Sequence, residues 1–370
     1  MIVPTKNAML LRRILLWPFT ALYGALLLAR HALYDGGLLK SERPEVATIA
    51  IGNLALGGTG KTPMMELVLR ILEGTAPLAT LSRGYGRADT DVHEVLESDT
   101  ADASGDEPVQ VKRKFPQVRV FVGADRVKAI EHIEERVVEV KVVLLDDALQ
   151  HRRLDAGLNI LLTTWSRPYC DDALLPAGRL RDLPSRAKAA HVVVVTKCPA
   201  LPDTAEHARW RARLGLTEGQ QSFFAGIGYD APSIRVVPSD GSKPSEHRSD
   251  PGALNRTNCL LFTGIADPAP LVAHLRSISG QVEHVAFSDH HPFTRTDLQR
   301  LADRYANFAA GPKMLVTTEK DAARLSSSIE GSPLDGLPLA VIGMRTIILN
   351  EPERFAELIR HHVTTHSAHR

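Results

Sequence analysis

Several features that would point to particular classes of protein are scarce in this sequence. Its three cysteines, Cys170, Cys198 and Cys259, are far apart and form no CxxC pair. This argues against a disulfide framework or a structural zinc site and favours a reducing compartment. The formal net charge is only +1, and aromatic residues make up 5% of the chain. Because nucleic-acid binding needs a basic surface and often stacking aromatics, we expect no nucleic-acid partner.

Long uncharged runs are also scarce, but one lies near the amino terminus. It occupies residues 14–29, between Arg13 and Arg30. A helix of this length spans about 24 Å, less than the ~30 Å hydrocarbon core of a bilayer. A secretory signal peptide is disfavoured, because export would separate the chain from the cytoplasmic nucleotide that its glycine-rich loop, described below, is expected to bind. A buried core helix stays an alternative. We expect residues 1–35 to form a membrane-associated helix that anchors at a membrane surface without necessarily crossing it.

The rest of the chain alternates short apolar runs with helical stretches. The runs are rich in β-branched residues and bounded by Gly, Pro or polar residues, and they span 46–51, 78–82, 118–123, 140–147, 158–163, 191–197, 259–266, 282–287, 313–321 and 339–344. Continuous apolar strands between helices predict an α/β fold with a mostly parallel sheet covered on both faces.

Composition also suggests how the chain is divided into domains. With 370 residues, the chain is long enough for two domains. Residues 231–258 are rich in Pro, Ser and charge, and we interpret them as a linker or insertion. We therefore expect a P-loop NTPase-like domain over 36–230 and a smaller C-terminal α/β domain over 259–370.

A glycine-rich loop stands between the first predicted strand and a predicted helix, the context that a phosphate-binding P-loop requires. Its residues are Ala55, Leu56, Gly57, Gly58, Thr59, Gly60, Lys61 and Thr62. Backbone N–H groups and the helix N-terminus would bind phosphate oxygens, Lys61 would bridge the β- and γ-phosphates, and Thr62 would hold Mg²⁺. Ala55 occupies the first glycine position of the pattern, so the paired glycines that follow would supply the curvature.

Two acidic pairs are candidates for metal and acceptor chemistry. Asp146 and Asp147 follow the apolar run 142–145, and a carboxylate at such a strand end can reach hydrated Mg²⁺ beside a P-loop. Asp106 and Glu107 lie in a Gly-Asp-Glu-Pro sequence that we interpret as a rigid turn. A kinase needs a carboxylate to orient and deprotonate its acceptor hydroxyl, separate from those at the metal, and the second pair is the candidate.

Taken in order along the chain, these motifs resemble those of the lipid A 4'-kinases (the tetraacyldisaccharide 4'-kinase family). The matching segments are GNLALGGTGKTP (52–63), SRGYGR (82–87), SGDEP (104–108), GADR (123–126), LLDDALQHRRL (144–154), LLPAGRLRD (174–182), FTGIADP (262–268), FSDHHPF (287–293) and VTTEKDAARL (316–325). The resemblance covers nearly the whole chain. It implies a kinase that transfers the γ-phosphoryl of ATP to the 4'-hydroxyl of an acylated glucosamine disaccharide 1-phosphate. This acceptor is a lipid A precursor in lipopolysaccharide biosynthesis, and the implied location is the cytoplasmic face of the bacterial inner membrane.

The resemblance also implies roles for individual residues. Catalytic roles are implied for Asp106 as the base, its partner His290, Lys61, Asp147 and Arg126. Roles at Mg²⁺ are implied for Thr62, Asp146, Glu107 and Gln150. Phosphate contacts are implied for Arg126 and Arg181, and a place near nucleotide or acceptor for Ser82, Arg83 and Tyr85.

Two positions depart from the family pattern. Ala148 stands where the family usually has glycine, so the turn after Asp147 cannot rely on a glycine. Asp182 stands where the family usually has glutamate, which leaves a direct contact between Asp182 and the metal open.

Some alternatives stay open at this point. The sequence Asp289-His290-His291 fits a polar loop, a metal site or, as we favour, a histidine that helps Asp106 carry its proton when the second domain closes. A P-loop ATPase or GTPase acting as a switch or metal chaperone is an alternative function. The apolar amino terminus and the absence of a second lysine before the paired glycines argue against it. The intact Lys61, Thr62 and Asp146 argue against a third alternative, a membrane adaptor with a degenerate P-loop.

Overall fold

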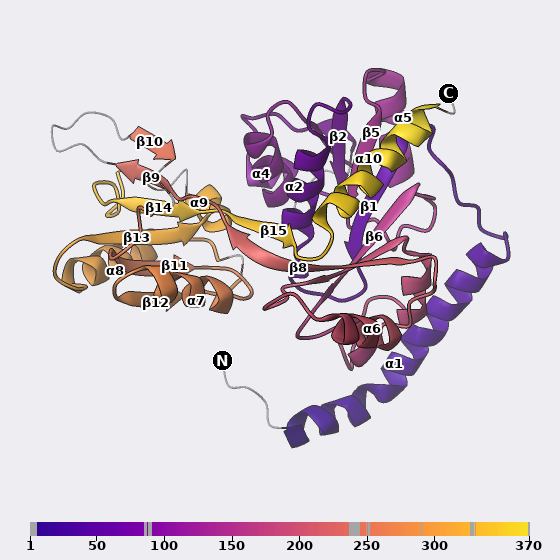
Figure 1. Ribbon diagram of the computed structural model, residues 1–370, viewed down its shortest axis with the longest axis horizontal. Helices are drawn as coiled ribbons and strands as arrows, with labels where there is room; N and C mark the ends of the chain where they lie inside the picture. The colour runs from indigo at the N-terminus through magenta and orange to yellow at the C-terminus, as the bar shows by residue number, and fades with distance from the viewer. Residues whose placement is uncertain are drawn as a thin grey trace. The chain divides into compact units, whose positions relative to one another are not determined.

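The chain folds into two compact units (Figure 1). The computed structural model describes residues 6–84, 87, 91–236, 245–248, 250, 252–289, 291–325, 329 and 331–368. One unit comprises residues 1–226 and 346–370, and the other comprises residues 227–345. Each unit is built around a sheet of its own.

The first unit contains a nine-stranded sheet ordered β15-β8-β7-β6-β1-β5-β2-β4-β3. Its strands are β1 (Ala47–Asn53), β2 (Leu78–Ser82), β3 (His93–Glu94), β4 (Arg119–Val122), β5 (Val142–Asp146), β6 (Leu158–Thr164), β7 (Val192–Thr196), β8 (Gln221–Tyr229) and β15 (Met344–Ile348). Pairing is parallel from β8 to β4, and only the short β3 is shown to pair antiparallel, with β4. The predicted α/β fold with a mostly parallel sheet is therefore confirmed.

Helices cover both faces of this sheet. They are α2 (Lys61–Leu72), α3 (Ala101–Ser104), α4 (Asp106–Lys114), α5 (Arg126–Arg136), α6 (Thr204–Arg213), α10 (Pro352–Ala368) and the 3₁₀ turns η1 (Tyr169–Asp171) and η2 (Pro184–Ala189). Because side chains alternate along a strand, Ile49 and Ile51 share one core with α2, α4 and α10, whereas Ala50 faces the core that contains α5. The parallel strands end at one edge of the sheet, which is where ligands bind in open α/β folds.

The second unit has a six-stranded sheet ordered β10-β9-β14-β13-β11-β12. Its strands are β9 (Ser233–Val236), β10 (Ser245–Arg248), β11 (Asn258–Thr263), β12 (Val282–Ala286), β13 (Lys313–Thr318) and β14 (Leu339–Ile342), and its helices are α7 (Ala269–Ile278), α8 (Arg295–Asn307) and α9 (Glu319–Leu325). The strands β12, β11, β13 and β14 are parallel, and β9 and β10 extend the sheet antiparallel. Thr318 caps α9, because its hydroxyl accepts a hydrogen bond from the Asp321 N–H at 3.2 Å.

The division into units differs from the one expected from the sequence. Segment 231–258, interpreted as a linker, contributes β9 and β10 to the second sheet. Residues 346–370, expected in the C-terminal domain, return to the first unit, where β15 lies beside β8 and α10 packs on α2. The cause is the apolar stripe of α10: Phe355 packs edge-on against Phe223, with 5.1 Å between ring centroids. The chain therefore passes between the units twice, through β8 and β15.

Helix α1 (Lys6–Asp35) belongs to the first unit and runs without interruption through Pro18. Its docked side includes small and polar residues such as Gly24, which meets Leu174, and the buried His31. Its other side exposes large apolar side chains, each at least 60% accessible: Leu15, Trp17, Phe19, Leu22, Leu26 and Leu28. In the described part of the chain, no helix combines the length and the apolar character needed to cross a membrane.

Candidate active site at the edge of the first sheet

The glycine-rich loop joins the central strand β1 to the N-terminus of α2. Gly57 (φ 109°) and Gly60 (φ 88°) adopt left-handed backbone conformations that favour glycine. The loop is held from within the protein, because the Asn53 amide donates to the Thr59 hydroxyl at 2.6 Å and the Thr196 hydroxyl donates to the Thr59 carbonyl at 2.8 Å. The N-terminus of α2 therefore follows directly after a rigid turn, which is the arrangement of an anion-binding site.

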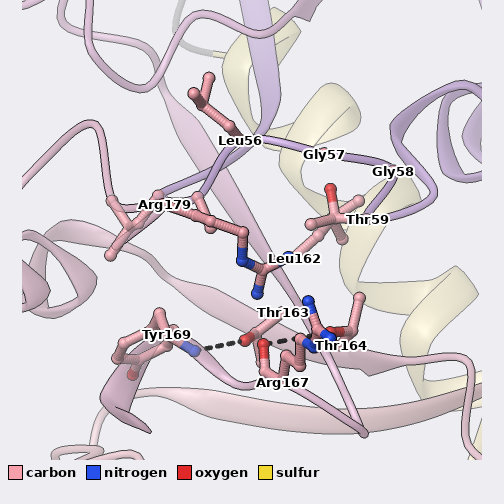
Figure 2. Close-up of a pocket in the computed structure, with 12 residues that line it drawn as sticks. Leu56, Gly57, Gly58, Thr59, Leu162, Thr163, Thr164, Arg167, Tyr169 and Arg179 are labelled. Carbon is pink, nitrogen blue, oxygen red and sulfur yellow. Dashed lines mark hydrogen bonds between the residues drawn. The ribbon is translucent and has the colours of Figure 1, made fainter. Parts of the chain in front are cut away.

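Ala55 fits the loop without the usual glycine because a neighbouring segment supports it. Ala55 pairs with Leu180 in an isolated bridge, and the N–H of Leu56 donates to the carbonyl of Arg179 at 2.8 Å. A pocket lies beside this part of the loop (Figure 2). Its wall also contains Arg167 and Arg179, whose guanidinium groups supply positive charge near the loop glycines.

Lys61, the first residue of α2, meets the carboxylate of Asp147. Its Nζ lies 3.9 Å from Asp147 Oδ2, and the Arg181 guanidinium donates to both oxygens of the same carboxylate. Arg181 also donates to Asn53 Oδ1 at 2.6 Å, which ties the end of β5 to the end of β1. Asp147 takes the left-handed conformation of this turn (φ 54°), while Ala148 does not, and therefore alanine is tolerated at the position where the family usually has glycine.

Asp146 occupies a different environment from its neighbour. Its carboxylate faces a pocket that is also lined by Thr62, Ser82 and Glu107. Its Oδ1 atom is buried and has no hydrogen-bond partner among the described residues. A buried polar oxygen without a partner is costly and indicates an absent ligand or cation.

The pKa values of the two aspartates are shifted in opposite directions. Burial, reinforced by the nearby charge of Glu107 and opposed by Lys61, raises the pKa of Asp146 to about 7. Burial also disfavours the charged form of Asp147, but the hydrogen bonds from Arg181 and the charge of Lys61 outweigh it and hold the pKa of Asp147 below its ordinary value. One carboxylate is thus a fixed anion, while the other needs a cation to ionise fully at neutral pH.

Arg126 begins α5 and is buried, with 3% of its surface exposed. Its guanidinium donates to the backbone carbonyls of Gly123 and, at 3.3 Å, of Asp146. Burial lowers the pKa of Arg126 to about 10, against the opposing charge of Asp146. These contacts hold the ends of β4 and β5 together, and a direct contact with a phosphate stays a prediction.

Asp106 and Glu107 do not lie in an isolated turn, as the sequence suggested, but in the first turn of α4. Gly105 precedes them with φ 91°, and a proline in a first helical turn loses no intrahelical hydrogen bond, so the Gly-Asp-Glu-Pro sequence starts a helix. Glu107 reaches the pocket of Asp146. Asp106 is its chain neighbour, and its role as base stays a prediction.

Gln150 and Asp182 make structural contacts instead of facing that pocket. The Gln150 amide donates to the carbonyl of Asn53 at 2.8 Å. Asp182 is buried and accepts a hydrogen bond from His31 at 2.6 Å. Neither residue lines the pocket around Asp146, so the structure gives no support to a metal contact by either.

His290 and Tyr85 lie outside the described residues, so their predicted roles stay predictions. The neighbour His291 stacks on Phe287, with 4.7 Å between ring centroids, and contacts Asp297 at 3.0 Å. In the described residues, no three His, Cys, Asp or Glu side chains converge on a metal-sized point. Mg²⁺ commonly takes only one or two carboxylates and fills its other positions with phosphate oxygens and water. The donors Thr62, Glu107 and Asp146, with an unpartnered buried Oδ1 on Asp146, fit such an ion.

Two residues that hold the site together, Asn53 and Thr196, are not among the site residues predicted from the sequence. Asn53 is a polar residue at the end of an apolar strand and contacts Thr59 and Arg181. Thr196 ends the valine-rich strand β7 and holds the glycine loop. A polar residue at the carboxyl end of a buried parallel strand is the signal that marks both.

A glycine loop at the end of a central parallel strand, followed by a lysine that faces Asp147 at the end of the adjacent strand, is typical of P-loop nucleotide-binding proteins of the α/β class. The family model for tetraacyldisaccharide-1-P 4'-kinase matches residues 12–364. Tetraacyldisaccharide 4'-kinase of Bacteroides thetaiotaomicron is 40% identical over 84% of this chain and 82% of its own length, and that of Flavobacterium johnsoniae is 38% identical over 94% and 95%. The chain belongs to the tetraacyldisaccharide 4'-kinase family, and it is a kinase of lipid A biosynthesis.

A solved structure agrees with this assignment. The crystal structure of LpxK from Aquifex aeolicus, described as an "apo" form in complex with ATP, matches with a TM-score of 0.69 and 25% identity. The match covers 95% of this chain and 99% of that chain. The similarity therefore includes both units and is not confined to the nucleotide-binding sheet.

Proposed function

We propose that this kinase transfers the γ-phosphoryl of ATP to the 4'-hydroxyl of its lipid disaccharide at the sheet edge formed by the glycine loop and Asp146-Asp147. The observation that supports this site is the distance of 3.9 Å between Lys61 Nζ, at the start of α2, and Asp147 Oδ2, just after β5. The loop before Lys61 follows β1, which pairs in parallel with β5. The LpxK structure that resembles this chain contains ATP, which supports the same nucleotide here.

The chain's own residues divide the work of positioning and charge stabilisation. Backbone N–H groups of the glycine loop and the N-terminus of α2 bind the phosphates, and Lys61 stabilises charge that develops on the transferred group. Asp147, held by Arg181, keeps Lys61 directed at the phosphates. Asp106 accepts the proton of the acceptor hydroxyl, and His290 assists it.

Mg²⁺ would be held by Thr62, Asp146 and Glu107, and it would neutralise phosphate charge during transfer. The partnerless oxygen of Asp146 and the pKa of about 7 that burial gives this group support that placement. With a cation bound nearby, the carboxylate of Asp146 stays ionised at neutral pH.

The acceptor is a lipid, and helix α1 supplies the surface that meets its membrane. The large apolar side chains on the exposed side of α1 would insert at the headgroup boundary of one leaflet, and the exposed Lys40 and Arg43 just after the helix would contact anionic headgroups. In a bacterium this surface is the cytoplasmic face of the inner membrane, where ATP is available.

The proposal is tested by following radiolabelled γ-phosphate from ATP into an acylated disaccharide 1-phosphate in mixed micelles. Lys61→Ala should lower turnover about 10³-fold, because one clamp on the phosphoryl group is lost. Lys128→Ala, on the exposed side of α5, is the matched control and should be unaffected. ATP consumption that is independent of the lipid acceptor, or full transfer by folded Lys61→Ala, would overturn the proposal.

A further inference from the structure

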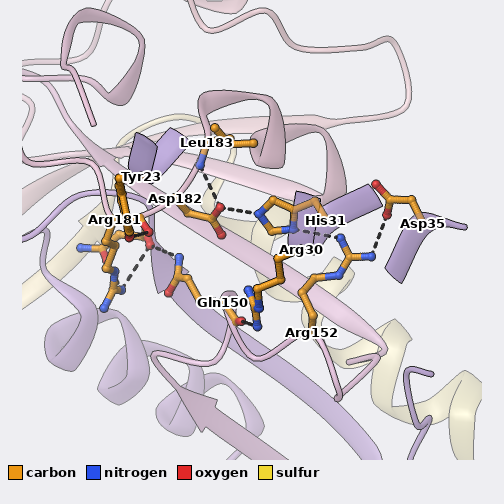
Figure 3. A network of polar contacts seen from close by, with 10 residues as sticks. Tyr23, Arg30, His31, Asp35, Gln150, Arg152, Arg181, Asp182 and Leu183 are labelled. Atoms are coloured by element: carbon orange, nitrogen blue, oxygen red, sulfur yellow. Dashed lines mark hydrogen bonds and ion pairs between the residues drawn. The ribbon is translucent and has the colours of Figure 1, made fainter. Parts of the chain in front are cut away.

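The docked side of α1 contacts the segments that hold the candidate active site (Figure 3). The Tyr23 hydroxyl donates to the backbone carbonyl of Arg181 at 2.7 Å, and Arg30 donates to the backbone carbonyl of Gln150 at 3.0 Å. His31 contacts the carboxylate of Asp182 at 2.6 Å. Two of these three contacts join α1 to the consecutive residues Arg181 and Asp182.

The contact between His31 and Asp182 is built inside the protein. His31 is 4% exposed and Asp182 is 1% exposed. The contact is a hydrogen bond to the carboxylate oxygen from the His31 tautomer that carries Nε2–H. The Nδ1 atom of His31 faces an Arg152 N–H at 3.4 Å, which suits an accepting nitrogen and the Nε2–H tautomer. Asp182 also accepts from the N–H of Leu183 at 2.8 Å, while its Oδ2 has no partner among the described residues.

Residues 150 and 181 connect α1 to the phosphate site. The side chain of Arg181, whose backbone is held by Tyr23, donates to Asp147 and to Asn53. The side chain of Gln150 donates to the carbonyl of Asn53 at 2.8 Å. Asp147 in turn faces Lys61. From α1 to the P-loop lysine there is thus an unbroken path of packed and hydrogen-bonded groups within one unit.

We propose that Tyr23, His31 and Asp182 are positioning residues for phosphoryl transfer, because they fix the backbone from which Arg181 holds Asp147. Helix α1 is then part of the catalytic framework as well as a membrane anchor. The inference rests on the proposed place of Asp147 at the phosphate site. A pure anchor would not need a buried histidine–carboxylate pair, because burying such groups costs free energy that docking through apolar side chains would avoid.

The test separates kcat from the KM of the lipid in mixed micelles with saturating ATP and acceptor. His31→Ala leaves a buried carboxylate without its strongest donor and should lower kcat about 10- to 100-fold, with the lipid KM within about twofold. His31→Gln places an amide N–H near the position of Nε2 and should restore most of kcat. Tyr23→Phe removes one oxygen and should lower kcat about two- to tenfold.

A matched control is His207→Ala, which removes a histidine that contacts Ser222 at 2.9 Å on α6 of the same unit. It should leave kcat unchanged. A rise in lipid KM alone, or a normal kcat in folded His31→Ala and Tyr23→Phe, would show that α1 is only an anchor. If His31→Ala does not fold, Tyr23→Phe and His31→Gln still decide the question. Absence of lipid-dependent transfer in the unmodified protein would instead overturn the proposed function.

Discussion

Asp146 and Asp147 are adjacent in the chain but have opposite effects on stability. Between about pH 4 and 7 the folded protein retains a proton on Asp146 that the unfolded chain has released, because burial raises the pKa of this group to about 7. The free energy of unfolding therefore falls as pH rises through that window. For Asp147, whose pKa is lowered, stability is present at neutral pH and is lost as pH falls below the ordinary range of aspartate.

Asp146→Asn should therefore stabilise the protein in the absence of nucleotide and metal, and more at pH 8 than at pH 5. The melting temperature should rise by about 2–4 °C for each kcal/mol recovered, measured by thermal unfolding at both pH values. Asp147→Asn is the matched control with the opposite sign, because it loses the ion pair with Arg181 and should lower the melting temperature at pH 8. Equal gains at both pH values for Asp146→Asn would contradict the raised pKa.

For single residues, the sequence predicts which side chains lie at the ends of strands better than it predicts which residues those side chains contact. Lys61, Thr62 and Asp146 are predictable because a loop or strand end places them locally. The partner of Asp182 is not, because His31 lies 151 positions away in the chain. The resemblance implies a metal role for Gln150, which stays a prediction. The hydrogen bond from the Gln150 amide to the carbonyl of Asn53 is not predictable, because it depends on how two strands align.

Among the elements, α1 has the most unusual distribution of side chains. Among the side chains of α1 whose exposure is described, Tyr23 and His31 contact the rest of the first unit, whereas most of the large apolar ones are exposed. A surface helix of a soluble domain shows the reverse pattern. This distribution supports the proposed contact of the exposed apolar side with a membrane, which can be measured separately from the docking of the helix.

Replacing Leu22 and Leu26 by Gln should weaken binding to anionic vesicles about 10²-fold, from the loss of roughly 3 kcal/mol of apolar transfer energy. Both side chains are 61% exposed, so the fold should be unchanged. The lipid KM should rise, while kcat in saturating micelles should persist. The control replaces Val138 and Leu201, which are exposed elsewhere in the same unit, by Gln. Unaltered sedimentation of the Leu22 and Leu26 variant with vesicles would place the anchor elsewhere.

The strands of both sheets were predictable from apolar runs, and β2 has the predicted bounds, 78–82. Local composition failed at 231–258, because the polar strands of this segment are ordered by pairing: β9 pairs with β14, and β10 pairs with β9. It also failed at α10, whose apolar stripe shows that the helix needs a partner but not which sheet supplies it. Long-range pairing, which no local pattern encodes, decides both cases.

At the scale of the whole molecule, the two halves of the predicted catalytic pair lie in different units. Asp106 starts α4 of the first unit, and the chain position of His290 falls in the second. A histidine within hydrogen-bonding reach would orient the Asp106 carboxylate and share its proton. The predicted pair therefore takes one residue from each unit.

A double-mutant cycle on kcat tests this coupling. Asp106→Ala should lower kcat about 10²- to 10⁴-fold and His290→Ala less. The double variant should be little worse than Asp106→Ala alone, because residues that act as one unit are not additive. ATP binding, measured by calorimetry, should persist in all three. Losses that multiply strictly would show that the two residues act independently, and the pair would be abandoned.

The two crossings between the units also determine the order in which the protein can assemble during synthesis. The apolar side of α2 is covered by α10, and Phe355 completes the core that contains Leu69 and Leu72. Residues 346–370 leave the ribosome only after the whole of the second unit, 227–345, has been made. Until then, the core that α2 and α4 form on this face of the first sheet lacks the apolar side chains that α10 contributes. Nascent-chain lengths that stop before α10 are the ones at which this protein most needs protection from aggregation.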